Sequence, residues 1–103
     1  MQIEDLIKCS ANNAIKWSLH AMKRLRERKI MIDDFINCIK TGEIIEDYPD
    51  DYPLPSCLIF GYSLDDEPLH IVVGCDDQTI YAITAYYPNP DEWEDDLKTR
   101  KES

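Results

Sequence analysis

Residues 32–48, IDDFINCIKTGEIIEDY, contain the point at which the hydrophobic period of the chain changes. Up to Thr41 apolar residues recur at helical spacing, with two acids in the first turn, where the helix dipole favours them. Gly42 stands at a helix stop position, and beyond it apolar and polar residues alternate. The stretch therefore predicts a helix over 32–41 followed directly by a strand over 43–48.

Two further helical patterns precede this stretch. In residues 2–9 the apolar side chains have the i, i+3, i+4 spacing of a short amphipathic helix. From Trp17 to Lys29, WSLHAMKRLRERK, four-residue steps form one apolar stripe and one basic stripe, and Ser18 is a candidate helix cap. We expect three helices within residues 2–41.

Three strand patterns follow it, at Cys57–Leu64, Leu69–Cys75 and Thr79–Tyr87. The connections at residues 65–68 and 76–78 are too short for a parallel return, so neighbouring strands should be antiparallel. Helices first and strands afterwards predict an α+β domain, with the helices packed on one face of a four-stranded antiparallel meander. The strands should lie within residues 43–87.

The length of 103 residues corresponds to one domain, residues 1–103, with a charged C-terminal tail at 88–103. Trp93 and Leu97 stand at helical spacing in that tail. This spacing predicts either a short docked helix or a frayed end.

The charge is strongly asymmetric along the chain. The net charge is −10, but residues 1–42 carry +3 and residues 43–103 carry −13. No apolar run approaches the roughly 20 residues that cross a bilayer, and the acids near the amino terminus do not resemble a signal peptide. We therefore expect a cytoplasmic protein without a membrane association.

Four cysteines are widely spaced and form no CxxC pair, so the sequence has no zinc pattern. In a reducing compartment they are expected to be free thiols that pack as small apolar side chains. The sequence predicts no metal and no cofactor.

Residues 16–29 hold six basic residues and one acid, a local charge of +5 in an acidic chain. Four-residue steps place His20, Arg24 and Arg28 along one side of the predicted helix. The other histidine, His70, lies on a predicted strand and should share a face with Val72 and Gly74, opposite Leu69, Ile71 and Val73. On the last strand, strict alternation would give Ile80, Ala82, Thr84 and Tyr86 a common face.

These residue types suit the cleavage of RNA without a metal. That reaction needs a base for the ribose 2′-hydroxyl, an acid for the leaving 5′-oxygen and cations beside the phosphorane. Histidine can do both proton transfers near neutral pH, and arginine donates two parallel hydrogen bonds to phosphate. We therefore expect both imidazoles and both guanidinium groups to converge on one open hollow.

Each of these residues also has a simpler interpretation. Basic side chains can cover the edge of a half-buried helix, a strand histidine is often structural, and threonine is a common strand former. Tyr86 and Tyr48 are interpreted as packing residues. The acids of residues 46–51 are interpreted as a solvated patch rather than a metal site. No phosphate-binding loop or other standard catalytic motif occurs.

The sequence resembles a small bacterial family, domain-of-unknown-function family 4258 (DUF4258). The residues that carry the resemblance are Ser18–Ala21, Arg24, Arg28–Ile30, Gly42–Tyr48, Leu69–Val72, Ile83–Pro88 and Trp93. That family is similar to the barnase–EndoU–colicin–RelE group of ribonuclease toxins, whose helices precede a four-stranded antiparallel sheet. The resemblance implies a metal-independent ribonuclease toxin with an active-site set of His20, Arg24, Arg28, His70 and Thr84.

It also implies an antitoxin partner, either zinc-binding or of the helix-turn-helix type, beside the RNA substrate. The alternative function is a non-catalytic interaction module of the same fold. Its acidic half would steer toward a basic protein partner.

Overall fold

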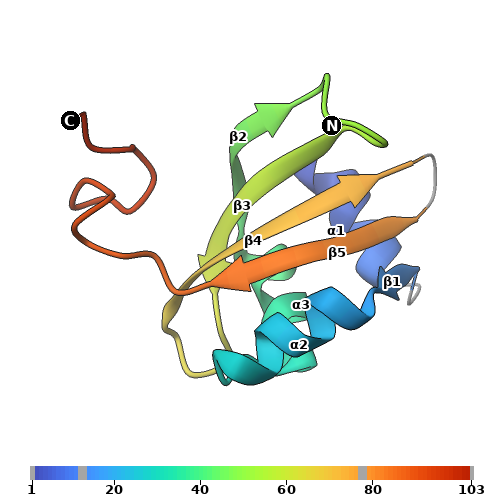
Figure 1. Ribbon diagram of the computed structural model, residues 1–103, viewed down its shortest axis with the longest axis horizontal. Coiled ribbons are helices and arrows are strands. Elements are labelled where there is room, and N and C mark those ends of the chain that lie inside the picture. The colour runs from blue at the N-terminus through green and yellow to red at the C-terminus, as the bar shows by residue number, and fades with distance from the viewer. Residues whose placement is uncertain (1, 12–13, 77–78, 103) are drawn as a thin grey trace.

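Three helices occupy one side of the molecule in the computed structural model, which describes residues 2–11, 14–76 and 79–102 (Figure 1). They are α1 (Ile3–Ala11), α2 (Leu19–Glu27) and α3 (Ile32–Thr41). The third helix has the predicted bounds. The second is shorter than predicted at both ends, because Trp17 belongs to a strand, Ser18 and Arg28 are the caps, and Lys29 has a positive φ of 58°. The predicted break at Asn12–Asn13 and part of the 76–78 connection lie outside the described residues.

The helix starts follow from local hydrogen bonds. The hydroxyl of Ser18 accepts a hydrogen bond from the amide of Ala21 (3.0 Å), so the predicted cap of α2 is confirmed. Met31 has no capping hydroxyl, and the carboxylate of Asp34 instead accepts a hydrogen bond from its amide (2.9 Å). The same carboxylate accepts a bond from the amide of Leu64 (3.0 Å), which ties the start of α3 to the turn at residues 63–67.

The strands form one mixed sheet in the order β1-β5-β4-β3-β2. The antiparallel meander of β2 (Glu43–Tyr48), β3 (Ser56–Tyr62), β4 (Pro68–Cys75) and β5 (Ile80–Tyr86) confirms the predicted α+β class. The predicted count of four strands is wrong, because β1 (Ile15–Trp17) pairs in parallel with the first half of β5. Three residues are too few for an alternating pattern to be recognised in the sequence.

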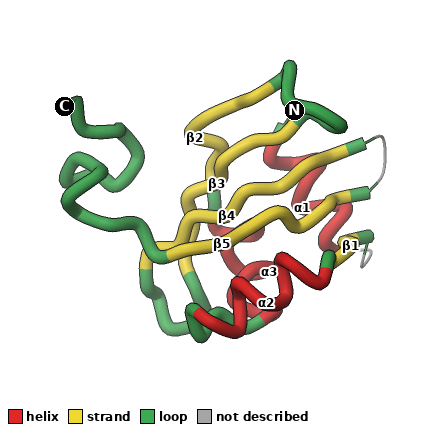
Figure 2. Tube along the Cα trace, in the orientation of Figure 1, coloured by secondary structure: helices red, strands yellow, loops and turns green. Residues whose placement is uncertain are grey.

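The core lies between the helices and what we call the inner face of the sheet (Figure 2). Two glycines let α3 approach this face closely. A Cβ at Gly42 or Gly61 would collide with the backbone carbonyl of Cys38 on α3. The core side chains come from all three helices and from β3, β4 and β5; among the fully buried ones are Leu6, Ala21, Phe35, Cys38, Ile39, Ile59, Leu69, Ile71, Val73, Ile80 and Ala85. Among the described residues no cysteine forms a disulfide, and Cys38 and Cys57 are buried.

Two single-residue bulges change which side chains reach the other, outer face. In β5 the partners of Val73 and Val72 are Ala82 and Thr84, so Ile83 is the extra residue. In β2 the pairing steps from Ile44 to Glu46 while β3 advances by one residue. The expectation that Ile80, Ala82, Thr84 and Tyr86 share a face is therefore wrong.

The register of the sheet shows where these residues go. His70 lies opposite Tyr86, and Val72 lies opposite Thr84, so both β5 residues share the outer face with His70. In β2, Glu46 lies opposite Leu58 on the same outer face. The predicted face of His70, opposite Ile71 and Val73, is confirmed, because the two apolar residues are in the core.

Residues 88–102, which we call the C-terminal segment, pack on the outer face, on the side away from the helices (Figure 2). Neither a helix nor a frayed end forms. Trp93 is buried and pairs in an isolated antiparallel bridge with Arg100. Leu97 has a φ of 58°, and the side chain of Asp96 accepts hydrogen bonds from the amides of Lys98 and Thr99 (2.9 and 3.1 Å). These bonds form a turn and leave no continuous helical ladder.

No helix among residues 2–11, 14–76 and 79–102 has both the length and the apolar composition needed to cross a membrane.

We predict that Gly61→Ala lowers the free energy of unfolding by about 2 kcal/mol or more, since its methyl group must push α3 away from β3. Gly74→Ala is the matched control, because a Cβ there meets its nearest heavy atom, in Ile83, at an ordinary 3.6 Å. Urea unfolding of the two variants measures the difference. Equal stability would show that α3 does not depend on this close approach.

Candidate active site

A line of basic side chains follows the sheet edge formed by β1 and β5. Lys16 on β1 lies beside Tyr81, with its ammonium 5.8 Å from the ring centre. His20 and Arg24 follow at four-residue steps along α2, and Arg28 caps the end of that helix, which runs beside β5 (Figure 1). We call these four residues the basic edge. The imidazole of His20 is exposed, and Arg24 pairs with Glu27 on its own helix (3.6 Å).

Arg28 joins this line to the sheet. Its guanidinium donates a hydrogen bond to the carbonyl of Ala85 (2.7 Å) and another to the hydroxyl of Thr84 (3.2 Å). It can reach them because β1 covers only residues 80–82 of β5, which leaves the remaining edge unpaired among the described strands. The structure thus brings two of the predicted site residues, Arg28 and Thr84, into direct contact.

His70 has a different environment. Its imidazole is fully buried on the outer face, between the rings of Phe60, Tyr86 and Trp93. Nε2 lies 2.7 Å from the carbonyl oxygen of Leu97, and Nδ1 lies 3.4 Å from the hydroxyl of Tyr86. Since a carbonyl can only accept, Nε2 carries the proton. Nδ1 is then the acceptor, and the hydroxyl of Tyr86 donates to it.

The charge state of His70 follows from this burial. Loss of water lowers its pKa below the ordinary value, while the Leu97 carbonyl opposes that shift. The nearby guanidinium of Arg100 lowers the pKa further, and the carboxylate of Glu46 raises it. Burial is the largest of these effects, so the imidazole is neutral at pH 7.

A second polar group lies beside His70 on the same face. Arg100 makes a two-point ion pair with Glu46, at 2.8 Å from Nε to Oε2 and 3.1 Å from Nη2 to Oε1. The hydroxyl of Tyr48 donates a short hydrogen bond to the same carboxylate. The hydrogen bond from Arg100 is the main reason that the pKa of Glu46 is lowered. Burial raises the pKa of Tyr48 and of Tyr86, so both hydroxyls keep their protons.

The five predicted site residues do not meet at one hollow. Thr84 and His70 share the outer face, and Arg28 reaches that face around the edge of β5. His20 lies on α2, whose buried residues Ala21 and Leu25 pack in the core on the inner face. It precedes Arg28 by two turns, about 12 Å along the axis. The expected convergence of two solvent-accessible imidazoles is therefore not observed, because the C-terminal segment covers one of them.

The sequence interpretation also missed residues that the structure places near His70, namely Glu46, Tyr86 and Arg100, and Tyr48, which bonds to Glu46. Tyr86 could have been recognised as the cross-strand neighbour of His70 if the bulge at Ile83 had been known. No local pattern indicates that Arg100 returns to Glu46, which lies 54 residues earlier. Among the described residues, no three His, Cys, Asp or Glu side chains are grouped so that they could hold a metal ion.

The fold and the site define a class of protein: a small α+β domain with helices on one sheet face and an acid, a histidine and arginines on the other. The family model described as "Domain of unknown function (DUF4258)" matches residues 17–87. The chain belongs to this family. The matched region includes Arg28, His70 and Thr84, whereas α1 and the C-terminal segment lie outside it. No curated protein and no solved structure matches the chain.

We predict that the stability of the protein falls on acidification below pH 6.5. His70 is neutral in the folded protein, and its folded pKa lies below the ordinary value of about 6.5. The unfolded chain therefore binds a proton first, and the free energy of unfolding decreases by up to about 1.4 kcal/mol per pH unit until the folded pKa is reached.

Urea unfolding between pH 7.5 and 5 measures this slope. Glu46 contributes only at lower pH, because its pKa is already lowered in the folded protein. His70→Gln should flatten the slope, whereas His20→Gln, the matched control at the exposed histidine, should leave the His70 contribution in place. An unchanged slope in His70→Gln would contradict the assignment.

Proposed function

We propose that this protein is a metal-independent ribonuclease whose reaction takes place where the outer sheet face meets the basic edge. One observation carries the proposal: the Tyr86–His70–Leu97 hydrogen-bond chain begins at Tyr86 on β5, the strand that also carries the Arg28–Thr84 contact. Tyr86 and Thr84 are two residues apart on the outer face of β5, so roughly 7 Å separates their Cα atoms. A phosphodiester at Arg28 would bring its ribose close to Tyr86.

The hydrogen-bond chain supports a role of His70 as a base acting through Tyr86. The phenol oxygen of Tyr86 takes the proton of the ribose 2′-hydroxyl while its own proton passes to Nδ1 of His70. The resulting imidazolium keeps its Nε2 proton on the carbonyl of Leu97, while the paired charges of Glu46 and Arg100 act on it in opposite directions. A neutral, buried imidazole is suited to this role because its acceptor nitrogen is free of protons at pH 7.

The phosphate is held by Arg28. Its guanidinium already points to the exposed edge of β5, and its five donors exceed the two acceptors that it now contacts. As the 2′-oxygen attacks, the P–O5′ bond breaks and the negative charge of the phosphorane is stabilised by this cation. Arg24, one turn earlier on α2, adds a second positive charge.

The leaving 5′-oxygen needs a proton from the opposite side of the phosphate. We assign this role to His20, the exposed histidine on the same basic edge. Since the backbones of His20 and Arg28 lie about 12 Å apart along the helix axis, the assignment requires the imidazole to swing along α2 toward the bound phosphate. The products are a 2′,3′-cyclic phosphate and a free 5′-hydroxyl, and the two histidines exchange protons with water before the next turnover. The assignment gives His70 and His20 different roles, one as base and the other as acid.

The Glu46–Arg100 ion pair has a positioning role in this scheme. It fixes the C-terminal segment on β2, and that segment contributes the Leu97 carbonyl that holds the His70 tautomer. A second ion pair, between Lys98 and Glu43 (2.5 Å), fixes the same segment three residues earlier on β2. The C-terminal segment is therefore the part of the site that orients His70, the general base.

We predict that the purified protein cleaves single-stranded RNA in the presence of EDTA and leaves 2′,3′-cyclic phosphate ends. Tyr86→Phe, which removes only the hydroxyl, and His70→Gln should each lower the rate about 10²- to 10⁴-fold. Arg28→Ala should lower it to a similar extent, since the phosphate loses its cation. Lys23→Ala is the matched control, because Lys23 is an exposed cation on α2 that pairs only with Glu27 among the described residues.

A substrate with sulfur in place of the bridging 5′-oxygen separates the two proton transfers, because a thiolate leaves without a proton. Cleavage of this substrate by His20→Gln should return to near the wild-type rate, whereas Tyr86→Phe and His70→Gln should stay slow. Wild-type rates in Tyr86→Phe on normal RNA would rule out the relay.

We propose a biological setting for this activity: the protein arrests growth of its host by cleaving RNA, and an antitoxin relieves that arrest. The acidic half of the chain, with −13 over residues 43–103, supports a basic antitoxin as the partner. We predict that expression of the wild-type chain alone stops growth of a bacterial host, while Tyr86→Phe produced at the same level does not. Harmless expression together with no RNA cleavage would favour the non-catalytic interaction module.

A further inference from the structure

A hollow of about 420 Å³ lies on the outer face at the other end of β5 from Tyr86. Its walls come from the loop between β2 and β3 and from the paired strands β4 and β5; the lining residues are Asp51, Tyr52, Pro53, Leu54, Gly74, Tyr81 and Ile83. The bulge at Ile83 places that side chain at the rim, where it is 42% exposed. The side chains of His70 and Tyr86 do not line this hollow.

The shape of this hollow depends on a missing side chain. Gly74 lies in its floor, and a Cβ there would meet Ile83, Pro55 and Leu54 at 3.6 to 3.8 Å. These are ordinary contact distances, so glycine is not needed for packing, and its effect is to leave the floor open. A larger side chain at this position would fill the space.

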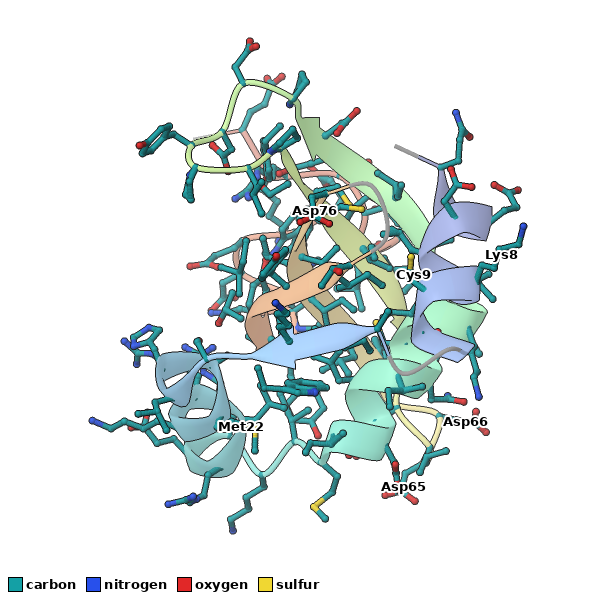
Figure 3. The ribbon with its side chains drawn as sticks, turned by 90° about the vertical axis from the view of Figure 1, so that its right-hand side faces the viewer. Lys8, Cys9, Met22, Asp65, Asp66 and Asp76 are labelled. Atoms are coloured by element: carbon teal, nitrogen blue, oxygen red, sulfur yellow. The ribbon has the colours of Figure 1, made fainter. Side chains whose placement is uncertain are left out.

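Two tyrosine rings make the hollow suited to a flat aromatic ligand. Tyr52 is 95% exposed, which is unusual for a ring of this size and leaves both of its faces available. Tyr81 is half-buried, and its hydroxyl donates a hydrogen bond to Asp76 (3.0 Å), the residue marked in Figure 3 where β4 ends. The ring of Tyr81 is therefore held in place before any ligand arrives.

Charges around the hollow discriminate between a base and a phosphate. Asp51 at the rim accepts a hydrogen bond from Ser56 (2.5 Å), and its negative charge disfavours a phosphate inside the hollow. Carboxylates instead accept hydrogen bonds from the amino groups of nucleobases. Lys16, 5.8 Å from the ring centre of Tyr81, stands next to the hollow and begins the basic edge that ends at Arg28.

We propose that this hollow is a nucleobase-binding subsite for single-stranded RNA, with the base stacked on Tyr52 and the backbone following the basic edge from Lys16 to Arg28. This inference rests on the proposed function and adds to it the part of the substrate that is recognised. Arg28 contacts Thr84 and Ala85, which follow Tyr81 by three and four residues on β5. Along a strand this places their Cα atoms roughly 10 to 13 Å from that of Tyr81. The subsite thus binds a base on the same strand of RNA, away from the scissile phosphate.

The test measures binding of oligonucleotides that cannot be cleaved. A fluorescently labelled 2′-O-methyl octanucleotide is compared by anisotropy with an abasic chain that has the same number of phosphates. We expect the wild-type protein to bind the chain with bases more tightly, and Tyr52→Ala to weaken that binding about tenfold, as for loss of one stacked base. Binding of the abasic chain should not change in the variant.

Matched variants distinguish a loss of binding from a loss of folding. Tyr52→Phe retains the ring and should keep wild-type affinity, whereas Gly74→Val fills the floor and should weaken binding as Tyr52→Ala does. Equal affinity for the two chains, or equal affinity of Tyr52→Ala and wild type, would overturn the subsite even if RNA is cleaved. Base-dependent binding without any cleavage of normal RNA would support the subsite and refute the ribonuclease.

Discussion

Two extra residues, Ile45 in β2 and Ile83 in β5, decide which side chains the sheet presents on its outer face. Strands alternate with period two, so one inserted residue moves every later side chain to the opposite side. In β5 the insertion turns Thr84 and Tyr86 outward, while Ala85 packs in the core. In β2 it turns Glu46 outward, onto the face of His70.

Without the C-terminal segment, the outer face would be poorly suited to contact with water. Trp93 covers the imidazole of His70 at a ring distance of 4.5 Å, and the Leu97 carbonyl satisfies its Nε2 proton. A buried histidine without that acceptor would cost about 1–3 kcal/mol in lost hydrogen bonding. The ion pairs to Glu43 and Glu46 are partly exposed, so they direct the segment to its place more than they stabilise it. The segment thus gives His70 one tautomer and one charge state.

Charge is separated in space as well as along the chain. The cations of residues 16–28 lie along the β1–α2 edge, and acids such as Asp51 and Glu46 lie on the sheet or beside it. A polyanion would therefore approach at the edge and not over the acidic face. At physiological salt the interaction between charges is largely screened beyond about 8–10 Å, so the nearest charges dominate. The net charge of −10 thus coexists with a local surface that is suited to phosphate.

Periodicity alone determined the third helix, the meander, the Ser18 cap and the outward face of His70, because each depends on residues that are neighbours in the chain. It also placed His20, Arg24 and Arg28 along one side of a helix, whereas the contact of Arg28 with β5 is known only from the structure. Only the tertiary structure decided the rest. A bulge depends on the partner strand, and β1 forms only because β5 offers a free edge. Two partners of His70, Trp93 and Leu97, come from the C-terminal segment, which docks on the outer face of the sheet, so no local pattern could indicate that the imidazole is sealed.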